Sequence, residues 1–409
     1  MISKQLTEKL ERIGVRVPRI LLPKEGVDMS KWAVVACDQF TSEPEYWAGV
    51  ERLVAEVSST YKITLPEVYL ESPDKQERIK EINEEMKKYL DEEVLEEKFE
   101  GFVLVERTLK SGKERRGLMV ALDLEKYDYH KGSKTLIRAT EGTVEARIPP
   151  RLEIRKEALI ELPHIMVLIN DKEKNVIEKT RGEEVIYDFD LMMNGGHVRG
   201  WKIMDEREIE KIAEALEKLI SSDGFLFAMG DGNHSLATAK AHWNNLKTTL
   251  SNQEQETHPA RFALVELVNV YDDGLEFEPI HRLVYKVESD KLIKFLEGDG
   301  EEVAVIMPEG GKKIRIKNRG SNLPVGNLQI LLDKYLEENP ETKIDYIHGR
   351  EAVEKLASEL QGVGFILPGM DKLDLFPTVE KDGALPRKTF SMGEAQEKRY
   401  YLEARKIVR

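Results

Sequence analysis

Residues 223–243 most constrain the fold, because a short apolar run meets a glycine-rich turn and is followed by an alanine-rich run. The apolar residues 225–228 predict a buried strand, and residues 236–241 predict a helix. Between them, the Gly-Asp-Gly sequence at 230–232 allows the backbone to turn sharply. A strand that turns directly into a helix is typical of an α/β protein.

The first turn of the predicted helix is a candidate anion site. Backbone N–H groups at a helix start have no intrahelical acceptor, and the helix dipole adds partial positive charge there. Asp231 is a candidate catalytic residue and metal ligand, and His234 is a second candidate catalytic residue. The same residue types also occur in ordinary turns and N-caps, so a purely structural turn is the alternative. The candidate phosphate-binding residues of this turn are Gly230, Gly232, Asn233 and Ser235.

Residues 231–235, followed by the alanine-rich helix, resemble the Asp-Gly-His-His-Arg box of the domain-of-unknown-function family numbered 1015. That box is similar to the one in the ParB and sulfiredoxin-like superfamily, which includes CTP-hydrolysing partition proteins, sulfiredoxin and free serine kinases. The resemblance continues in the same order along nearly the whole chain. The other matching segments are 137–141 with Arg147 and Arg151, 200–203, 279–284, 347–349 and 386–389.

The resemblance implies a mixed α/β fold with a ParB/sulfiredoxin-like core. We expect an N-terminal α/β section over residues 1–130, a central section with the glycine turn over 131–285, and a C-terminal α/β section over 286–409. The function that it implies is binding of a nucleotide such as ATP, ADP or CTP, with Mg²⁺, and phosphoryl transfer to or from a small hydroxy amino acid. A nucleotide-sensing regulatory module and a phosphatase of a phosphorylated metabolite are the alternatives.

The chain departs from the family box at two positions. Asn233 stands where the box has its first histidine, and Ser235 stands where it has arginine. A planar guanidinium can bind phosphate through two parallel hydrogen bonds, and a serine hydroxyl cannot replace its charge. Nucleotide binding therefore requires a cation from elsewhere in the chain. The candidates for that cation are Lys240, Arg282 and Lys388.

A second candidate region is the charged segment at 138–155. If this segment reaches the glycine turn, its arginines would hold phosphate oxygens, and Glu141 could act as a general base toward a hydroxyl. Pairing on a solvated surface is an equally weighted alternative. We further expect His281, a candidate catalytic residue, and the strand that carries it to line the same cleft. The candidate phosphate-binding residues outside the turn are Arg138, Arg147, Arg151, Arg282 and Lys388.

Composition limits the classes of protein and partner. A length of 409 residues suggests two or three domains, or one large α/β body with insertions. The formal net charge of −14 argues against nucleic acid as a general partner, because phosphate backbones are bound by basic surfaces. The charged fraction of 34% resembles the composition of thermophile proteins. Self-association into a homo-oligomer stays open.

Several other classes are excluded or disfavoured. The one cysteine, Cys37, excludes an internal disulfide, and its apolar neighbours favour a core role over a nucleophile. No apolar run approaches the roughly 18 residues that cross a bilayer, and the charged residues 1–10 are unlike a secretion signal. We therefore expect a cytoplasmic protein without a membrane partner. The P-loop, Gly-x-Ser-x-Gly and His-Glu-x-x-His patterns are absent from the sequence.

Overall fold

The computed structural model describes residues 2–41, 43–321 and 323–409 and divides the chain into two compact units. Unit 1 comprises Met1–Ala139, Thr143–Leu275 and Glu394–Arg409. Unit 2 comprises Thr140–Gly142 and Glu276–Gly393. This division differs from the three sections expected from the sequence, since strands on both sides of residue 130 share one sheet and the last residues return to unit 1.

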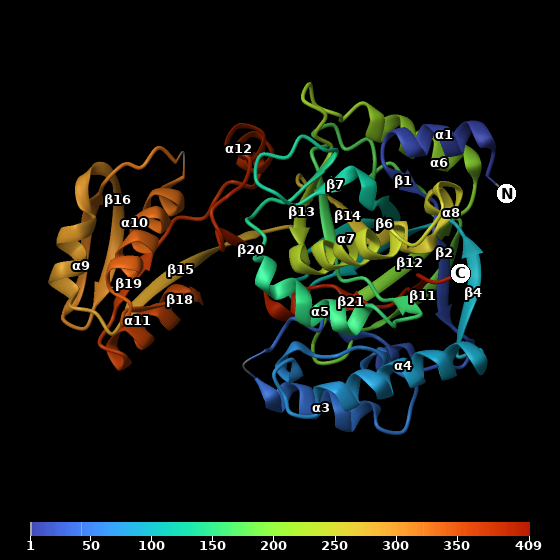
Figure 1. Cartoon of the computed structure of the whole chain (residues 1–409), viewed down its shortest axis with the longest axis horizontal. Coiled ribbons are helices and arrows are strands. Elements are labelled where there is room, and N and C mark those ends of the chain that lie inside the picture. The colour runs from blue at the N-terminus through green and yellow to red at the C-terminus, as the bar shows by residue number, and fades with distance from the viewer. Residues whose placement is uncertain (1, 42, 322) are drawn as a thin grey trace. The chain divides into compact units, whose positions relative to one another are not determined.

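Among the described residues, unit 1 is built on a ten-stranded mixed sheet with the order β11-β12-β5-β6-β14-β10-β13-β8-β7, and β1 pairs with β6 (Figure 1). The β10–β14, β13–β8 and β7–β8 pairs are parallel, whereas the other neighbours are antiparallel. The strands are β1 Val15–Arg16, β5 Phe102–Thr108, β6 Glu114–Asp123, β7 Tyr127–Asp128, β8 Ile137–Arg138, β10 Met166–Ile169, β11 Glu184–Asp190, β12 His197–Ile203, β13 Phe227–Asp231 and β14 Phe262–Asn269. The mixed α/β fold expected from the sequence is confirmed.

The middle of this sheet is buried on both faces, which explains why the β14 sequence is almost continuously apolar. Side chains alternate between the faces, as the pleat requires. Leu118 and Val120 of β6 pack in the core that contains side chains of α1, α6 and α7, whereas Met119 packs in the core that contains α3 side chains. The helices are α1 Lys4–Arg12, α3 Pro44–Val54, α6 Glu206–Glu217 and α7 Asn233–Lys247.

The C-terminal segment of unit 1 pairs with strands that come early in the chain. Its strand β21 (Tyr400–Tyr401) pairs with β3 (Val34–Val35), and β22 (Arg405–Lys406) pairs with β9 (Ile160–Glu161). A further pair joins β2 (Arg19–Pro23) to β4 (Leu95–Glu100). The remaining helices of unit 1 are α2 Met29–Trp32, α4 Lys75–Asp91, α5 Ile148–Arg155 and α8 Asn252–Thr257.

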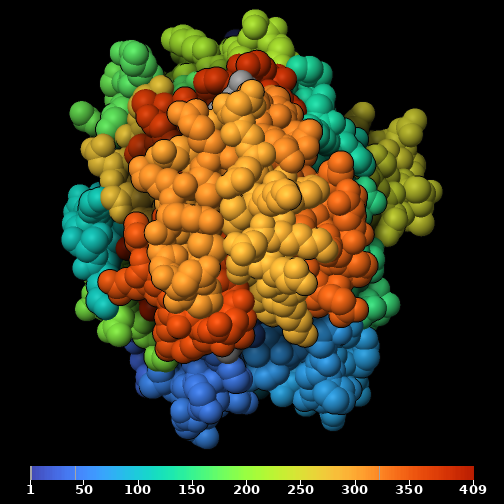
Figure 2. Space-filling model, turned by 90° about the vertical axis from the view of Figure 1, so that its left-hand side faces the viewer, coloured from blue at the N-terminus to red at the C-terminus, as the bar shows by residue number. Residues whose placement is uncertain are grey.

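Unit 2 has its own sheet and core, and Figure 2 shows residues 276–393 in colours from golden through orange to red. In the described residues the sheet has six strands in the order β17-β16-β19-β15-β18, and β20 pairs with β15. Val303, Val305 and Met307 of β16 alternate into a core shared with α9 and α10. The elements are β15 Phe277–Tyr285, α9 Ser289–Leu296, β16 Glu297–Met307, β17 Gly310–Ile316, α10 Pro324–Glu338, β18 Lys343–His348, α11 Arg350–Glu359, β19 Val363–Ile366, α12 Leu375–Asp382 and β20 Phe390–Met392.

Candidate functional site

The glycine turn connects β13 directly to α7. Strand β13 ends at Asp231, α7 begins at Asn233, and Gly232 between them has a φ of 75° in the left-handed region. A Cβ atom at Gly232 would lie 3.0 Å from the Ile165 Cα atom. Glycine is therefore required here both by the backbone conformation and by the close approach of a neighbouring chain segment.

The Asp231 carboxylate is paired with a lysine from the C-terminal segment. Asp231 Oδ2 lies 3.0 Å from Lys398 Nζ, and Asp231 Oδ1 accepts a 2.9 Å hydrogen bond from the Gly232 N–H. The side chains of Asp231 and Lys398 are 24% and 9% exposed. Burial alone would raise the pKa of Asp231, but the charge and hydrogen bond of Lys398 hold that pKa below its ordinary value. The turn therefore carries a carboxylate that is ionised at neutral pH.

Thr143 and Val144, which lie in the charged segment at 138–155, contact the first turn of α7. The Asn233 Nδ2 atom donates to Thr143 Oγ1 at 3.2 Å, and the Val144 N–H donates to His234 Nε2 at 3.3 Å. The Asn233 Oδ1 atom is buried and has no hydrogen-bond partner in the described parts of the chain. Asn233 thus connects the loop at Thr143 to the first turn of α7, while its own Oδ1 atom stays without a hydrogen bond.

His164 lies close to Asp231 and contacts Tyr401, in a cluster that the sequence did not predict. The ring atom His164 Nδ1 lies 2.9 Å from Tyr401 Oη, which also accepts the Cys37 N–H at 3.1 Å. The charge of His164 helps to lower the pKa of Asp231. Burial raises the pKa of the Cys37 thiol, so Cys37 stays protonated at neutral pH and is a poor nucleophile.

Lys398 supplies a cation near the turn, whereas the sequence predicted Lys240, Arg282 or Lys388 in this role. Lys240 instead donates to the Leu124 carbonyl at 2.8 Å, and burial lowers its pKa. Arg107 holds the segment around Lys398 by donating to the Lys398 carbonyl at 3.3 Å and to the Gln396 carbonyl at 2.9 Å. No local pattern indicated Lys398, because it reaches Asp231 only through tertiary folding.

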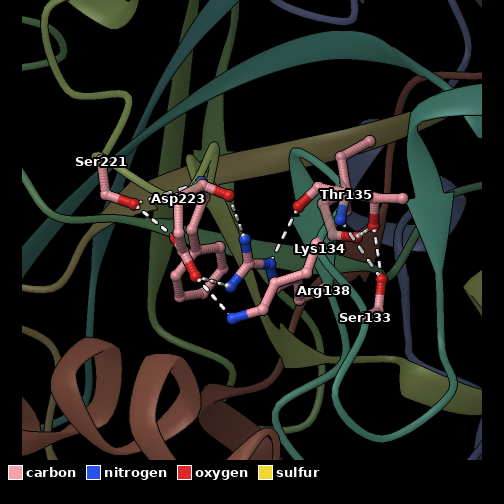
Figure 3. Close-up of polar contacts among 8 residues, drawn as sticks. Ser133, Lys134, Thr135, Arg138, Ser221 and Asp223 are labelled. Carbon is pink, nitrogen blue, oxygen red and sulfur yellow. Dashed lines mark hydrogen bonds and ion pairs between the residues drawn. The ribbon is translucent and has the colours of Figure 1, made fainter.

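Arg138 of the charged segment is engaged in contacts within unit 1 (Figure 3). Its Nη1 atom lies 3.0 Å from Asp223 Oδ2, its Nη2 atom donates to the Asp223 carbonyl at 2.9 Å, and its Nε atom donates to the Thr135 carbonyl at 2.9 Å. The guanidinium also lies over the Phe225 ring at 4.6 Å, and Arg138 is 2% exposed. All three nitrogens have protein partners, so the predicted phosphate contact would require Arg138 to give up hydrogen bonds that support the fold.

The other two arginines of the segment differ from each other. Arg151 forms a bidentate ion pair with Glu67, in which Nε lies 2.8 Å from Oε1 and Nη2 lies 2.5 Å from Oε2. Arg147 is exposed, and its guanidinium has no ion-pair partner among the described residues. Of the arginines predicted to hold phosphate, Arg147 alone therefore keeps its charge available in unit 1.

The remaining predicted site residues belong to unit 2. Glu141 Oε1 accepts the Thr389 N–H at 3.3 Å, and burial raises the pKa of Glu141. His281 Nδ1 accepts the Leu367 N–H at 3.2 Å, and burial lowers the pKa of His281. Arg282 is fully buried and donates to Gln329 Oε1 at 3.0 Å and to the Arg387 carbonyl at 2.9 Å, while Lys388 is exposed. We expect the glycine turn, the charged segment at 138–155 and the strand that carries His281 to line one cleft. That arrangement stays a prediction.

No group of three or more histidine, cysteine, aspartate or glutamate side chains suited to a metal ion occurs within the described ranges. The predicted metal ligand Asp231 has Lys398 as its partner instead. Within the same ranges, no helix combines the length and the apolar character that a bilayer crossing requires.

Comparisons with known proteins give one family and several solved structures. The model of a family described as a protein of unknown function (DUF1015) matches residues 21–406. A conserved hypothetical protein from Pyrococcus furiosus is 14% identical with a TM-score of 0.36, and the match covers 71% of this chain and 95% of that one. A variant of free serine kinase in complex with ADP is 13% identical with a TM-score of 0.40, over 71% and 92%.

A third structure, truncated SbnI from Staphylococcus aureus, is 9% identical with a TM-score of 0.37, and the match covers 67% of this chain and 82% of that one. The curated proteins give no match. At these TM-scores the likeness to solved structures says nothing about the ligands of this chain.

Proposed function

The chain belongs to the DUF1015 family, and we propose that its glycine turn binds the phosphate groups of a nucleotide. One observation carries this proposal: the 15-residue helix α7 starts two residues after Asp231, and the Asp231 carboxylate lies 3.0 Å from the Lys398 ammonium. A helix N-terminus supplies backbone N–H donors and partial positive charge, and an adjacent lysine is a common point charge for phosphate.

Lys398 takes over the charge that the family box normally supplies through arginine. A lysine binds phosphate as a point charge rather than through a planar pair of hydrogen bonds, so it suits a flexible polyphosphate. The Asp231 carboxylate is the ion-pair partner of the buried Lys398 side chain when no ligand is present. In the charged segment, the exposed Arg147 is a second candidate cation, and it has no ion-pair partner in the described parts of unit 1.

A magnesium ion would enter this site with the nucleotide. Mg²⁺ keeps several waters and binds proteins through one or two carboxylates together with substrate phosphates. Asp231 fits that role, because it is partly exposed and its lowered pKa keeps it ionised. The ion would neutralise part of the phosphate charge. Asn233 and Ser235, in the first turn of α7, would donate hydrogen bonds to the phosphate oxygens through their amide and hydroxyl groups.

The reaction that we propose is phosphoryl transfer between the nucleotide and a small hydroxy amino acid. Phosphoryl transfer depends mainly on positioning and on positive charge around the phosphates, which are the properties that this turn offers. His234 is the candidate for moving a proton within unit 1, because its Nε2 atom accepts a long 3.3 Å hydrogen bond from Val144 that a substrate hydroxyl could replace.

The test is a turnover assay with ATP, ADP or CTP, magnesium, and serine or threonine, followed by phosphorus NMR. We expect nucleotide conversion with the natural chain and a loss of about 100-fold or more with Asp231→Asn, measured at a temperature at which the variant is still folded. Asp273→Asn is the matched control, because the Asp273 side chain is 96% exposed and lies outside the turn. Equal rates for Asp231→Asn and Asp273→Asn would exclude this role for Asp231, and binding without turnover would indicate a sensor instead.

A further inference from the structure

Unit 1 contains a second candidate site, a cavity with a volume of about 450 Å³. This volume lies in the range of small-molecule sites. The cavity walls come from β1, β2, β4, β6, β14, β22 and the last residues of the chain, and none of residues 230–235 lines it. Figure 1 shows the C-terminal end near β2 and β4, and Leu21 of β2 pairs with Ala404.

Basic side chains outnumber acidic ones in the lining, although the whole chain is acidic. Two carboxylates, Glu97 and Glu100, also line the cavity. The cationic lining residues are Arg16, Arg19, Arg405, Lys406 and Arg409.

Ion pairs cancel the charge of three of these cations. The pairs are Arg19 with Glu97 at 3.7 Å, Arg405 with Glu161 at 2.9 Å, and Arg409 with Glu254 at 3.1 Å. Arg16 and Lys406 have no carboxylate partner among the described residues. Two cations therefore remain in the lining against the one carboxylate of Glu100, an arrangement that favours an anion.

Arg16 is held in place without an acidic partner. Its guanidinium carbon lies 4.7 Å from the centre of the Phe262 ring, so stacking fixes the side chain while its N–H groups keep their hydrogen-bonding capacity. Arg405 is buried nearby. Burial is the main cause that lowers the pKa of Arg405, and repulsion from Arg155 and Arg16 adds to it. An anion at Arg16 would offset this repulsion.

Most of the remaining lining residues are apolar. Val17, Leu21, Ala121, Phe262 and Val408 contribute hydrocarbon surface to the cavity. A bare inorganic anion would leave this surface in contact with water, whereas a ligand with an apolar body would cover it. We propose that the cavity binds a small organic anion, with its carboxylate or phosphate group at Arg16 and Lys406 and its apolar part against Phe262 and Leu21.

Calorimetric titration of the full chain with phenyl phosphate, benzoate and the neutral benzyl alcohol tests this proposal. We expect at least one of the two anions to bind with a Kd below about 1 mM, and benzyl alcohol to bind at least about tenfold more weakly. Phenyl phosphate and benzoate distinguish a phosphate-bearing ligand from a carboxylate. Arg16→Gln should weaken anion binding about tenfold, since it removes a charge-assisted hydrogen bond. Arg12→Gln is the control, because Arg12 is exposed and pairs with Glu217 outside the cavity.

Three results would overturn the proposal: no binding of either anion at about 5 mM, equal binding of benzyl alcohol, or unchanged anion affinity in Arg16→Gln. If Arg16→Gln lowers the melting temperature, Lys406→Glu replaces it, because Lys406 is exposed and the variant reverses its charge. An ATP titration of Arg16→Gln separates this site from the glycine turn. Unchanged ATP affinity is expected, and a loss would show that the cavity is the nucleotide site rather than a second one.

Discussion

At the residue scale, buried charges in unit 1 are held by more than one partner. Arg399 forms ion pairs with Glu266 and Glu403, and all three side chains are nearly inaccessible to solvent. Such arrangements stabilise the fold only while every member is present, because removing one partner leaves an uncompensated buried charge. Sequence alone could not identify this network, because Glu266 lies 133 residues from Arg399 and all three residues resemble solvated surface charges.

Arg138 gives the clearest test of such a structural charge. Arg138→Gln should lower the free energy of unfolding by about 2 kcal/mol at neutral pH, because Asp223 loses its guanidinium partner. The hydrogen bond from Arg138 is the main cause that holds the pKa of Asp223 below its ordinary value. This stabilisation is therefore present above about pH 4 and is lost as the pH falls below the unfolded pKa of aspartate.

Urea denaturation at several pH values measures this effect. The difference between the natural chain and Arg138→Gln should shrink as the solution is acidified, and Arg12→Gln should show a small difference throughout, because Arg12 is exposed. A difference for Arg138→Gln that stays constant down to about pH 2 would contradict the assignment of this energy to Asp223.

At the element scale, the turn from β13 to α7 is the feature that the sequence predicts best. The predicted strand at 225–228 and helix at 236–241 correspond to β13 at Phe227–Asp231 and α7 at Asn233–Lys247. The helix begins earlier than predicted because polar residues form its first turn, and the strand begins later because the Leu226 and Phe227 N–H groups both donate to the Leu136 carbonyl.

Gly232→Ala tests the requirement for glycine at this turn. The substitution should destabilise the protein by about 2 kcal/mol, from the left-handed backbone and from the contact with Ile165. Gly112→Ala is a matched control, because Gly112 has a φ of 81° and no atom within 4 Å of an added Cβ. Chemical denaturation should show a larger loss at Gly232, and equal losses would mean that the close approach costs nothing.

At the scale of the whole molecule, the chain folds into two units whose boundaries the sequence did not reveal. The C-terminal residues 394–409 join unit 1 through pairs with β3 and β9, and Lys398 comes with them. Composition does not change at these boundaries, and pairing between distant strands leaves no local pattern. The glycine turn was predictable because its residues are consecutive in the sequence. Lys398 was not predictable because it reaches the turn only through pairing of distant strands.

The separate cores predict separate local stabilities. Leu331→Ala should create a cavity in the unit 2 core and cost about 3 kcal/mol there, because Leu331 is fully buried. Hydrogen exchange should then accelerate in β16 and β17 while β6 and β14 in unit 1 stay protected. Leu264→Ala in unit 1 should give the reverse pattern. Equal acceleration in both sheets would show that the two units unfold as one.

Nucleotide binding at the glycine turn is the central claim, and calorimetric titration with ATP and magnesium tests it most directly. The natural chain should bind ATP, and Lys398→Gln should weaken binding by about tenfold or more, because it removes the ammonium beside Asp231. Lys211→Gln, at a lysine that is 73% exposed on α6, should leave the affinity unchanged. Absence of ATP binding at millimolar concentration, or equal affinities of the natural chain and Lys398→Gln, would contradict the claim.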